Sequence, residues 1–271
     1  MTTTRLCLLL SFLALVTACS VSQSDERAIG EANAAQVDSE LPIVHDSVVD
    51  RFVTELGRSM ASKTSRADLD WRFAVVNSSE VNAFALPGGF IYVNRGAIEQ
   101  ADRFDEIAGI MGHEIGHVVR RHSVKQLQGQ ERHAVELVLL CTLTRVCRTI
   151  GGRAAVRVGA TALSAQYSQF DEAEADSEGV VNTVRAGIDP EGLPAFFEKL
   201  FEARKSQPSA FEVFFSTHPS DESRVARTRK QIAGLKLNPE KGLVRDTPEF
   251  HAIQERVRAW PAAPKPDSTP K

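Results

Sequence analysis

The chain has 271 residues, of which 42% are hydrophobic and 25% are charged, and its formal net charge is −3. This length and composition predict one or two ordinary globular domains, with enough chain to bury a core. So small a net charge gives no support to nucleic acid or to an anionic membrane surface as a partner.

Residues 1–18 have the pattern of a signal peptide. Arg5 precedes an apolar run from Leu6 to Val16, which is too short to span a bilayer as a helix but is typical of a signal-peptide core. The next residues, Thr17-Ala18-Cys19, complete a sequence similar to the bacterial lipobox, in which cleavage precedes the cysteine and Cys19 becomes the lipid-bearing terminus. A plain secretory signal with a coincidental cysteine is the alternative.

The lipobox interpretation also predicts a location. Neither Ser20 nor Val21 is the aspartate that retains Gram-negative lipoproteins at the inner membrane, so we expect a periplasm-facing lipoprotein of the bacterial cell envelope, in the outer membrane. After the signal, no charge-free stretch reaches the roughly 18 residues that a membrane span requires. Contact with the membrane is therefore expected through the lipid anchor only.

The rest of the chain is expected to form one domain between a tether and a tail. Residues 19–40 are polar and are expected to be a lipid-anchored tether, residues 41–235 the folded domain, and residues 236–271 a partly disordered tail. Within the domain, the patterns predict a helix over 42–62, strands over 71–77 and 90–93, and a helix N-capped by Asp102. Further helices are expected near 124–140, 152–168, 170–186, 190–204 and 219–233.

Two cysteines lie beyond the signal and the lipobox. Cys141 and Cys147 would point to different sides of one continuous helix, but a turn between two helices would bring them within bridging range. An oxidising periplasm permits the bond. The sequence leaves two alternatives open, a disulfide and a pair of buried thiols.

The segment His113-Glu114-Ile115-Gly116-His117 carries the strongest chemical signal, because it spells H-E-x-x-H. On a helix, His113 and His117 lie on one face, so both rings can bind one zinc ion. Glu114 is placed to act on a water in the open position of the metal. The motif predicts one zinc ion per chain, and it requires a third protein ligand.

Two layouts for the third ligand fit poorly. The metzincin layout needs a histidine six residues after the second one, but that position is Ser123, and His122 falls one residue short. In the thermolysin-like layout, Glu136 stands near the required distance, but no second carboxylate follows it one turn later.

A more distant segment, Asp171-Glu172-Ala173-Glu174-Ala175-Asp176, fits better. On a helix, Glu172 and Asp176 share a face, so Glu172 can bind zinc while Asp176 accepts the free ring N–H of a ligand histidine. Glu174, with Glu178 four residues on, is the rival for the ligand role.

Taken together, these motifs resemble those of the minigluzincin zinc metallopeptidases, the family of HtpX and the CAAX prenyl protease. Within it, the chain is most similar to the periplasmic LoiP- and BepA-like branch, and especially to LoiP-like lipoproteins. The resemblance runs from about Val75 to Arg227. It rests on Asn82-Ala83-Phe84, Pro87-Gly88-Gly89, the motif at 113–117, Glu172-x-x-x-Asp176, and His218-Pro219 with Arg224 five residues beyond the proline. It implies an α+β, predominantly helical fold with a zincin-like (minigluzincin) core and a small antiparallel or mixed β-sheet.

The resemblance also implies roles for individual residues. His113, His117 and Glu172 would bind zinc, Glu114 would be the catalytic acid and base, and Asp176 would orient a ligand histidine. His218 would lie near the zinc, where it could keep the enzyme latent or stabilise an oxyanion, and Arg224 is assigned to the same regulatory or oxyanion group. A loop histidine without such a role is the other interpretation of His218.

The expected function is that of a zinc-dependent endopeptidase in protein quality control, cleaving unfolded or misassembled envelope proteins. An extended substrate would add as a further strand to a free edge offered by Phe90, Ile91, Tyr92 and Val93. The alternative is a zinc-bound latent protease or a chaperone-like binder that acts in outer-membrane assembly.

Overall fold

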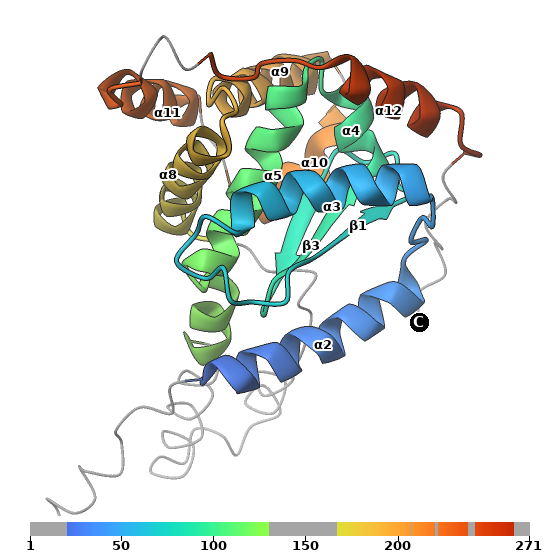
Figure 1. The fold of residues 1–271 in the computed structure, drawn as a ribbon, viewed down its shortest axis with the longest axis vertical. Helices are drawn as coiled ribbons and strands as arrows, with labels where there is room; N and C mark the ends of the chain where they lie inside the picture. The colour runs from blue at the N-terminus through green and yellow to red at the C-terminus, as the bar shows by residue number, and fades with distance from the viewer. Residues whose placement is uncertain (1–20, 130–166, 207, 220–221, 238–241, 263–271) are drawn as a thin grey trace, which may run out of the picture.

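The computed structural model describes residues 21–129, 167–206, 208–219, 222–237 and 242–262. Over these ranges the chain is mostly helical, with one three-stranded sheet (Figure 1). The expected α+β class with a small mixed sheet is therefore confirmed. The elements in chain order are α2 (Gln23–Glu40), α3 (Ser47–Ala61), β1 (Arg72–Val76), β2 (Ala83–Leu86), β3 (Phe90–Asn94), α4 (Arg95–Gln100), α5 (Phe104–Val119), α8 (Gln169–Ala186), α9 (Gly192–Ser206), α10 (Pro208–Thr217), α11 (Ser223–Gly234) and α12 (Pro248–Arg258).

The sheet has the strand order β1-β3-β2. β1 runs parallel to β3, and β2 runs antiparallel to it, with Ala85 opposite Ile91. The expected strands over 71–77 and 90–93 are confirmed, but the expectation that the second offers a free edge is wrong. Hydrogen-bonded neighbours flank β3 on both sides, and the edge positions belong to β1 and β2. The four residues concerned are all buried in the central strand: Phe90, Ile91, Tyr92 and Val93.

Helices cover both faces of this sheet. Phe73 and Ile91 point to one face and join the main core, which includes residues of α3 and α5. Tyr92 points to the other face and packs in a second cluster with Ala34 and Val37 of α2. Because β3 is covered on both faces, its sequence is a continuous apolar run instead of an alternating one.

Helix α2 occupies most of the segment that was expected to be a tether. It begins at Ser22, whose side chain forms a capping box with Asp25. Glu26, only 1% exposed, accepts hydrogen bonds from two nitrogens of Arg66 at 2.7 and 3.0 Å and forms an ion pair with Arg121 at 2.8 Å. Residues 23–40 thus form a docked helix. The polar composition of this segment suggested a tether, but α2 packs on the rest of the molecule through a few small apolar side chains and the buried charge of Glu26.

Helix α5 runs through the core, and its residues from Asp105 to Val118 are all buried. Its N-cap residue is Arg103, and the expected N-cap, Asp102, instead pairs with Lys199 at 2.6 Å. A carboxylate of the first turn, Glu106, accepts a hydrogen bond from the Asp102 N–H at 2.9 Å. α5 is thus buried on all sides, although it carries the charged or polar side chains of Asp105, Glu106, His113, Glu114 and His117.

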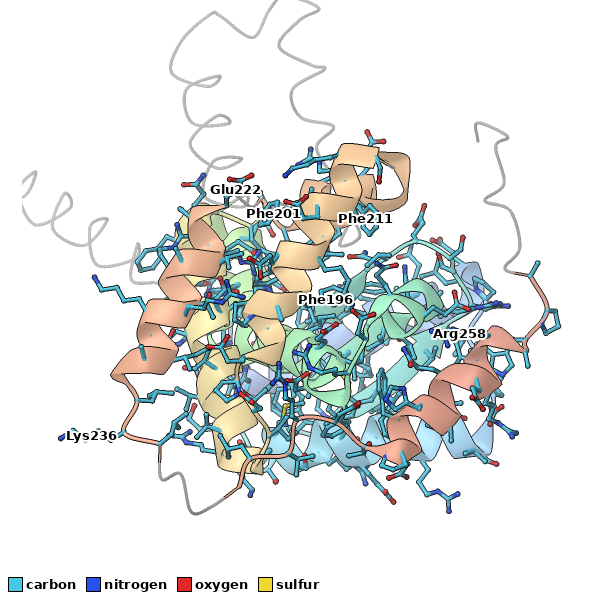
Figure 2. All side chains as sticks on the ribbon, turned by 90° about the horizontal axis from the view of Figure 1, so that it is seen from above. Phe196, Phe201, Phe211, Glu222, Lys236 and Arg258 are labelled. Atoms are coloured by element: carbon cyan, nitrogen blue, oxygen red, sulfur yellow. The ribbon has the colours of Figure 1, made fainter. Side chains whose placement is uncertain are left out.

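Among the described residues from 167 onward, helices lie as expected near 170–186, 190–204 and 219–233, and α10 is an additional helix. Nearly all of the helix expected near 152–168 and most of the one expected near 124–140 lie outside the described residues. Seen from above, α9, α11 and α12 lie across one end of the molecule (Figure 2). α12 falls in the expected tail, yet its Phe250, Ile253 and Val257 are buried in the main core. None of the described helices is both long and apolar enough to cross a membrane. Four residues with expected roles lie outside the described ranges, namely Cys19, Glu136, Cys141 and Cys147.

The docking of α2 gives a stability prediction. Glu26→Ala leaves Arg66 and Arg121 without their shared carboxylate and should lower the free energy of unfolding by about 3 kcal/mol, as expected when one partner of a buried ion pair is removed. The matched control is Glu31→Ala on the same helix, whose pair with Arg27 is 3.5 Å long and about half exposed, and which should cost less than about 0.5 kcal/mol. Urea unfolding measures both variants, and equal losses would contradict the role of Glu26.

Candidate metal centre

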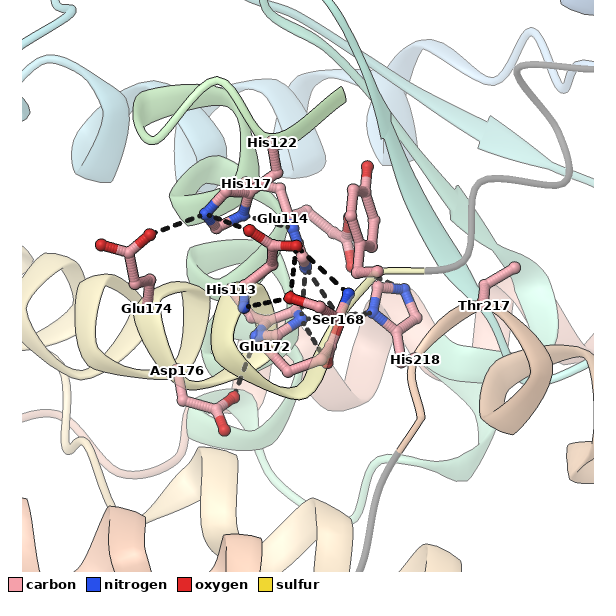
Figure 3. Close-up of polar contacts among 12 residues, drawn as sticks. His113, Glu114, His117, His122, Ser168, Glu172, Glu174, Asp176, Thr217 and His218 are labelled. Atoms are coloured by element: carbon pink, nitrogen blue, oxygen red, sulfur yellow. Dashed lines mark hydrogen bonds and ion pairs between the residues drawn. The ribbon is translucent and has the colours of Figure 1, made fainter. Parts of the chain in front are cut away.

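The functional side chains of α5 are buried together. His113 and His117 stand one helical turn apart, and their Nε2 atoms approach to 2.9 Å (Figure 3). Glu114, between them in sequence, is fully buried. Two imidazole nitrogens that converge in a buried space provide half of the usual donor set of a zinc site.

Helix α8 supplies the third donor. Ser168 begins this helix with a capping box, which places Glu172 in the first turn. One Glu172 oxygen lies 3.4 Å from His117 Nε2, and the other lies 3.5 Å from His113 Nε2. The structure thus brings the three predicted ligands together. With His218 they form a buried group whose donor atoms all lie within 4.8 Å of one another.

Glycines allow α5 and α8 to approach closely enough for this contact. A Cβ on Gly116 would lie 2.8 Å from the carbonyl oxygen of Ala175, and one on Gly112 would lie 3.2 Å from that of Gly179. A Cβ on Gly179 itself would lie 3.1 Å from the backbone nitrogen of His113. Larger residues at these positions would separate the histidines from the carboxylate.

Asp176 and Arg224 support the far side of His113. Asp176 Oδ1 lies 2.9 Å from His113 Nδ1, which keeps the proton on Nδ1 and leaves Nε2 free to bind a metal. Arg224 of α11 donates two hydrogen bonds of 2.6 Å to Asp176, and its Nη1 lies 2.8 Å from Glu172 Oε2. Its guanidinium also lies 3.9 Å from the ring centre of Phe197. Arg224 therefore positions both Glu172 and Asp176.

Burial and charge set the protonation of the site. Burial lowers the pKa values of His113 and His117, which favours the neutral rings that metal binding requires. Burial acts to raise the pKa of Glu172, but the charges of His218 and Arg224 outweigh it and hold that pKa well below the usual range. Burial raises the pKa of Glu114 to about 7, because the neighbouring positive charges offset only part of the desolvation.

These residues fit a zinc ion. When ionised, Glu114, Glu172 and Asp176 carry three negative charges against the positive charge of Arg224 and, when it is protonated, that of His218, and all of these side chains are buried. The remaining net negative charge would be costly in the interior unless a cation balanced it. Neither carboxylate oxygen of Glu114 has a hydrogen-bond partner among the described residues. A donor set of two histidines and one glutamate leaves an open position on zinc, where a polarised water beside Glu114 would meet that need.

His218 lies at this centre, where the family resemblance implied. Its Nδ1 is 3.0 Å from Glu172 Oε1 and 3.4 Å from His113 Nε2, and its Nε2 is 3.4 Å from Glu114 Oε1. The side chain is 1% exposed. Its imidazole can therefore reach both the metal donors and the carboxylate of Glu114.

Three other residues have positions that the sequence did not reveal. Glu174, the rival ligand, lies outside the group of four donors and contacts His122 at 3.2 Å. His122 in turn contacts His117. Tyr167 stacks on the His117 ring with a centroid distance of 3.9 Å, and its hydroxyl lies 2.8 Å from Ser123 Oγ. No motif pointed to Tyr167, because its contact with His117 spans fifty residues of sequence.

Comparison with known proteins gives a family match. A model of peptidase family M48 matches residues 48–232, which is more than half of the chain. The beta-barrel assembly-enhancing protease of Escherichia coli (strain K12) is 27% identical over 248 residues, which cover 88% of this chain and 49% of that protein.

Two further relatives are also metallopeptidases by name. The metalloprotease YcaL of Escherichia coli (strain K12) is 24% identical over 220 residues, which cover 81% of this chain and 84% of that protein. The mitochondrial metalloendopeptidase OMA1 of Arabidopsis thaliana is 32% identical over 186 residues, which cover 66% of this chain and 36% of that protein. The chain spans about half the length of the beta-barrel assembly-enhancing proteases that it matches.

The glycine contact between α5 and α8 can be tested directly. Gly116→Ala forces a methyl group against the Ala175 carbonyl, so we expect a loss of about 1–3 kcal/mol in unfolding free energy and weaker zinc binding. The control is Gly129→Ala, in the helical segment that follows, where an added Cβ meets nothing within 4 Å. This substitution should leave the free energy of unfolding unchanged or raise it slightly. Thermal unfolding and zinc titration measure both variants. Unchanged zinc affinity in Gly116→Ala would contradict the importance of the close approach.

Proposed function

The chain belongs to peptidase family M48, and we propose that it is a zinc-dependent endopeptidase. One observation carries the proposal: the donor atoms of His113, His117 and Glu172 converge beside the buried carboxylate of Glu114. A zinc ion held by these three residues would polarise the peptide carbonyl as a Lewis acid and lower the pKa of a bound water toward about 7.

Glu114 moves the proton in the proposed reaction. Its carboxylate accepts a proton from the attacking water, and the carboxyl group then donates that proton to the nitrogen of the departing amine. Burial raises its pKa to about 7, so the group can both accept and release a proton near neutral pH. Asp176 keeps His113 in the tautomer that binds metal, and Arg224 holds Asp176 in place.

We propose that the substrate binds along β2. The Asn94 N–H donates to the Asn82 carbonyl, so the alternation of an antiparallel pair turns the backbone groups of Ala83 and Ala85 away from β3. A cavity of about 180 Å³, lined by residues that include Ala85 and His218, lies between this strand and the metal centre. Only a locally extended chain can add to a strand edge, which favours unfolded or misassembled polypeptides as substrates.

For the cellular setting, we propose a bacterial envelope protein that faces the periplasm, lipidated at Cys19 and held at the outer membrane. The signal and lipobox pattern of residues 1–19 supports this proposal. Envelope proteins would then be the substrates, in a role of protein quality control. The folded unit would extend from α2 to α12, so that little chain separates the lipid from the domain.

A latent state is the second candidate, and the position of His218 favours it. An imidazole within 3.4 Å of both Glu172 and His113 can occupy the open position of a metal held there and keep water from it. In that state the protein would bind chains without cleaving them, as a chaperone-like factor in outer-membrane assembly.

The endopeptidase proposal predicts the behaviour of Glu114→Gln. The amide cannot accept the proton, so cleavage of unfolded casein should fall by at least about 10²-fold while one zinc ion per chain remains bound. Casein cleavage and zinc content are measured on a soluble fragment that lacks residues 1–19 but keeps α2. Glu255→Gln, on the exposed face of α12, serves as the control and should retain activity. Full cleavage by Glu114→Gln would contradict the assigned role.

The latency candidate makes a separate prediction for His218→Ala. Removing the imidazole should raise casein cleavage several-fold and leave zinc bound, because three protein ligands remain. His251→Ala, at a half-exposed histidine on α12, is the control and should change neither quantity. Lower cleavage by His218→Ala would favour an oxyanion role, and unchanged cleavage would remove both roles.

A further inference from the structure

His122 lies directly against a predicted zinc ligand. Helix α5 ends at Val119, and Arg121 adopts a left-handed backbone with φ of 58°. This turn brings His122 back toward α5, where its Nδ1 lies 2.9 Å from Nδ1 of His117. The side chain of His122 is fully buried.

The other nitrogen of His122 faces helix α8. Its Nε2 lies 3.2 Å from Glu174 Oε2 and 3.6 Å from Asp171 Oδ1. His117, His122 and Glu174 therefore form a continuous row of polar contacts that begins at the metal centre and ends at a partly exposed carboxylate.

Metal binding by His117 determines which ring nitrogen of each histidine in this row carries the proton. His117 Nε2 points at the other ligands, so its proton must reside on Nδ1. That N–H can donate only if Nδ1 of His122 is an acceptor, which requires the proton of His122 to reside on Nε2. The carboxylate of Glu174 accepts that second proton and thereby stabilises the required tautomer.

We infer that His122 and Glu174 position His117 for zinc, as Asp176 positions His113. Both ligand histidines are thus oriented from α8, one directly by a carboxylate and the other through an intermediate imidazole (Figure 3). Glu174 and Asp176 are two residues apart, so they lie on different sides of the helix, and only the intermediate ring can connect Glu174 with His117. The inference rests on the proposed zinc site.

A second cation site is the competing interpretation, because donor atoms of His122, Asp171 and Glu174 also lie within 4.8 Å of one another. The surrounding charges oppose it. Lys125 Nζ lies 3.6 Å and Arg120 Nη1 3.4 Å from Glu174, so two cationic groups already occupy the neighbourhood of that carboxylate. A proton on His122 Nε2 also removes the lone pair that a metal would need.

The acceptor role of His122 is tested by two substitutions in the full-length chain. His122→Asn can place an amide oxygen near the position of Nδ1, whereas His122→Leu fills the space without an acceptor. We expect His122→Leu to bind zinc about 10–100-fold more weakly and to change the visible spectrum of the cobalt-substituted protein, and His122→Asn to restore much of the affinity. If His122 only filled space, the His122→Leu variant would bind zinc as tightly as the His122→Asn variant or more tightly. Parental affinity and an unchanged cobalt spectrum in His122→Leu would overturn the inference.

A second pair of variants serves even if His122→Leu fails to fold. Glu174 and Glu178 both form ion pairs with Arg120, at 3.4 and 2.8 Å, but only Glu174 contacts His122. Glu174→Ala should weaken zinc binding several-fold, while Glu178→Ala should not. Equal effects would overturn the inference, as would a parental protein that binds two zinc ions per chain and loses one of them in Glu174→Ala.

The tautomer provides a readout that is independent of activity. In the ¹⁵N-labelled, zinc-loaded protein, long-range ¹H–¹⁵N correlation should show the His122 ring with its proton on Nε2. A proton on Nδ1 of His122 would place its N–H directly against the Nδ1–H of His117, with no acceptor between them. Observation of that tautomer would overturn the inference. If zinc binding itself failed in the parental protein, the proposed function would fail first, and the two failures would be distinguishable.

Discussion

The site depends on the close approach of two helices. His113 and His117 stand on α5, Glu172 and Asp176 stand on α8, and glycines on both helices let the backbones meet. If the two helices moved apart by about 1 Å, Glu172 could no longer share a zinc ion with the histidines, because its carboxylate oxygen must reach within about 2.2 Å of that ion. The sheet and the other helices pack around α5 in the main core.

Buried charge is the second constraint. The interior holds more carboxylates than cations, and Arg224 reaches two of them while it covers Phe197. Such a cluster is unfavourable unless every group has a partner, and a zinc dication supplies the missing positive charge. Fold stability and metal binding are therefore linked through the same side chains.

The sequence predicted most of the metal centre because its patterns are local. The spacing of His113 and His117, and that of Glu172 and Asp176, follows from the geometry of one helical turn. Non-local facts escaped prediction. The pairing of β3 with two neighbours depends on strands elsewhere, although its continuous apolar run is typical of a strand covered on both faces. The docking of Glu26 joins it to Arg66 and Arg121, which are far away in sequence. The return of His122 depends on the backbone turn at Arg121, which no local pattern revealed.

The most direct test of the central claim is a crystal structure of the zinc-loaded protein with anomalous diffraction measured at the zinc edge. The account predicts one zinc ion per chain, bound by Nε2 of His113, Nε2 of His117 and the carboxylate of Glu172 at about 2.0–2.2 Å. A zinc ion bound instead by His122, Asp171 and Glu174, or a protein that binds no zinc between α5 and α8, would contradict it.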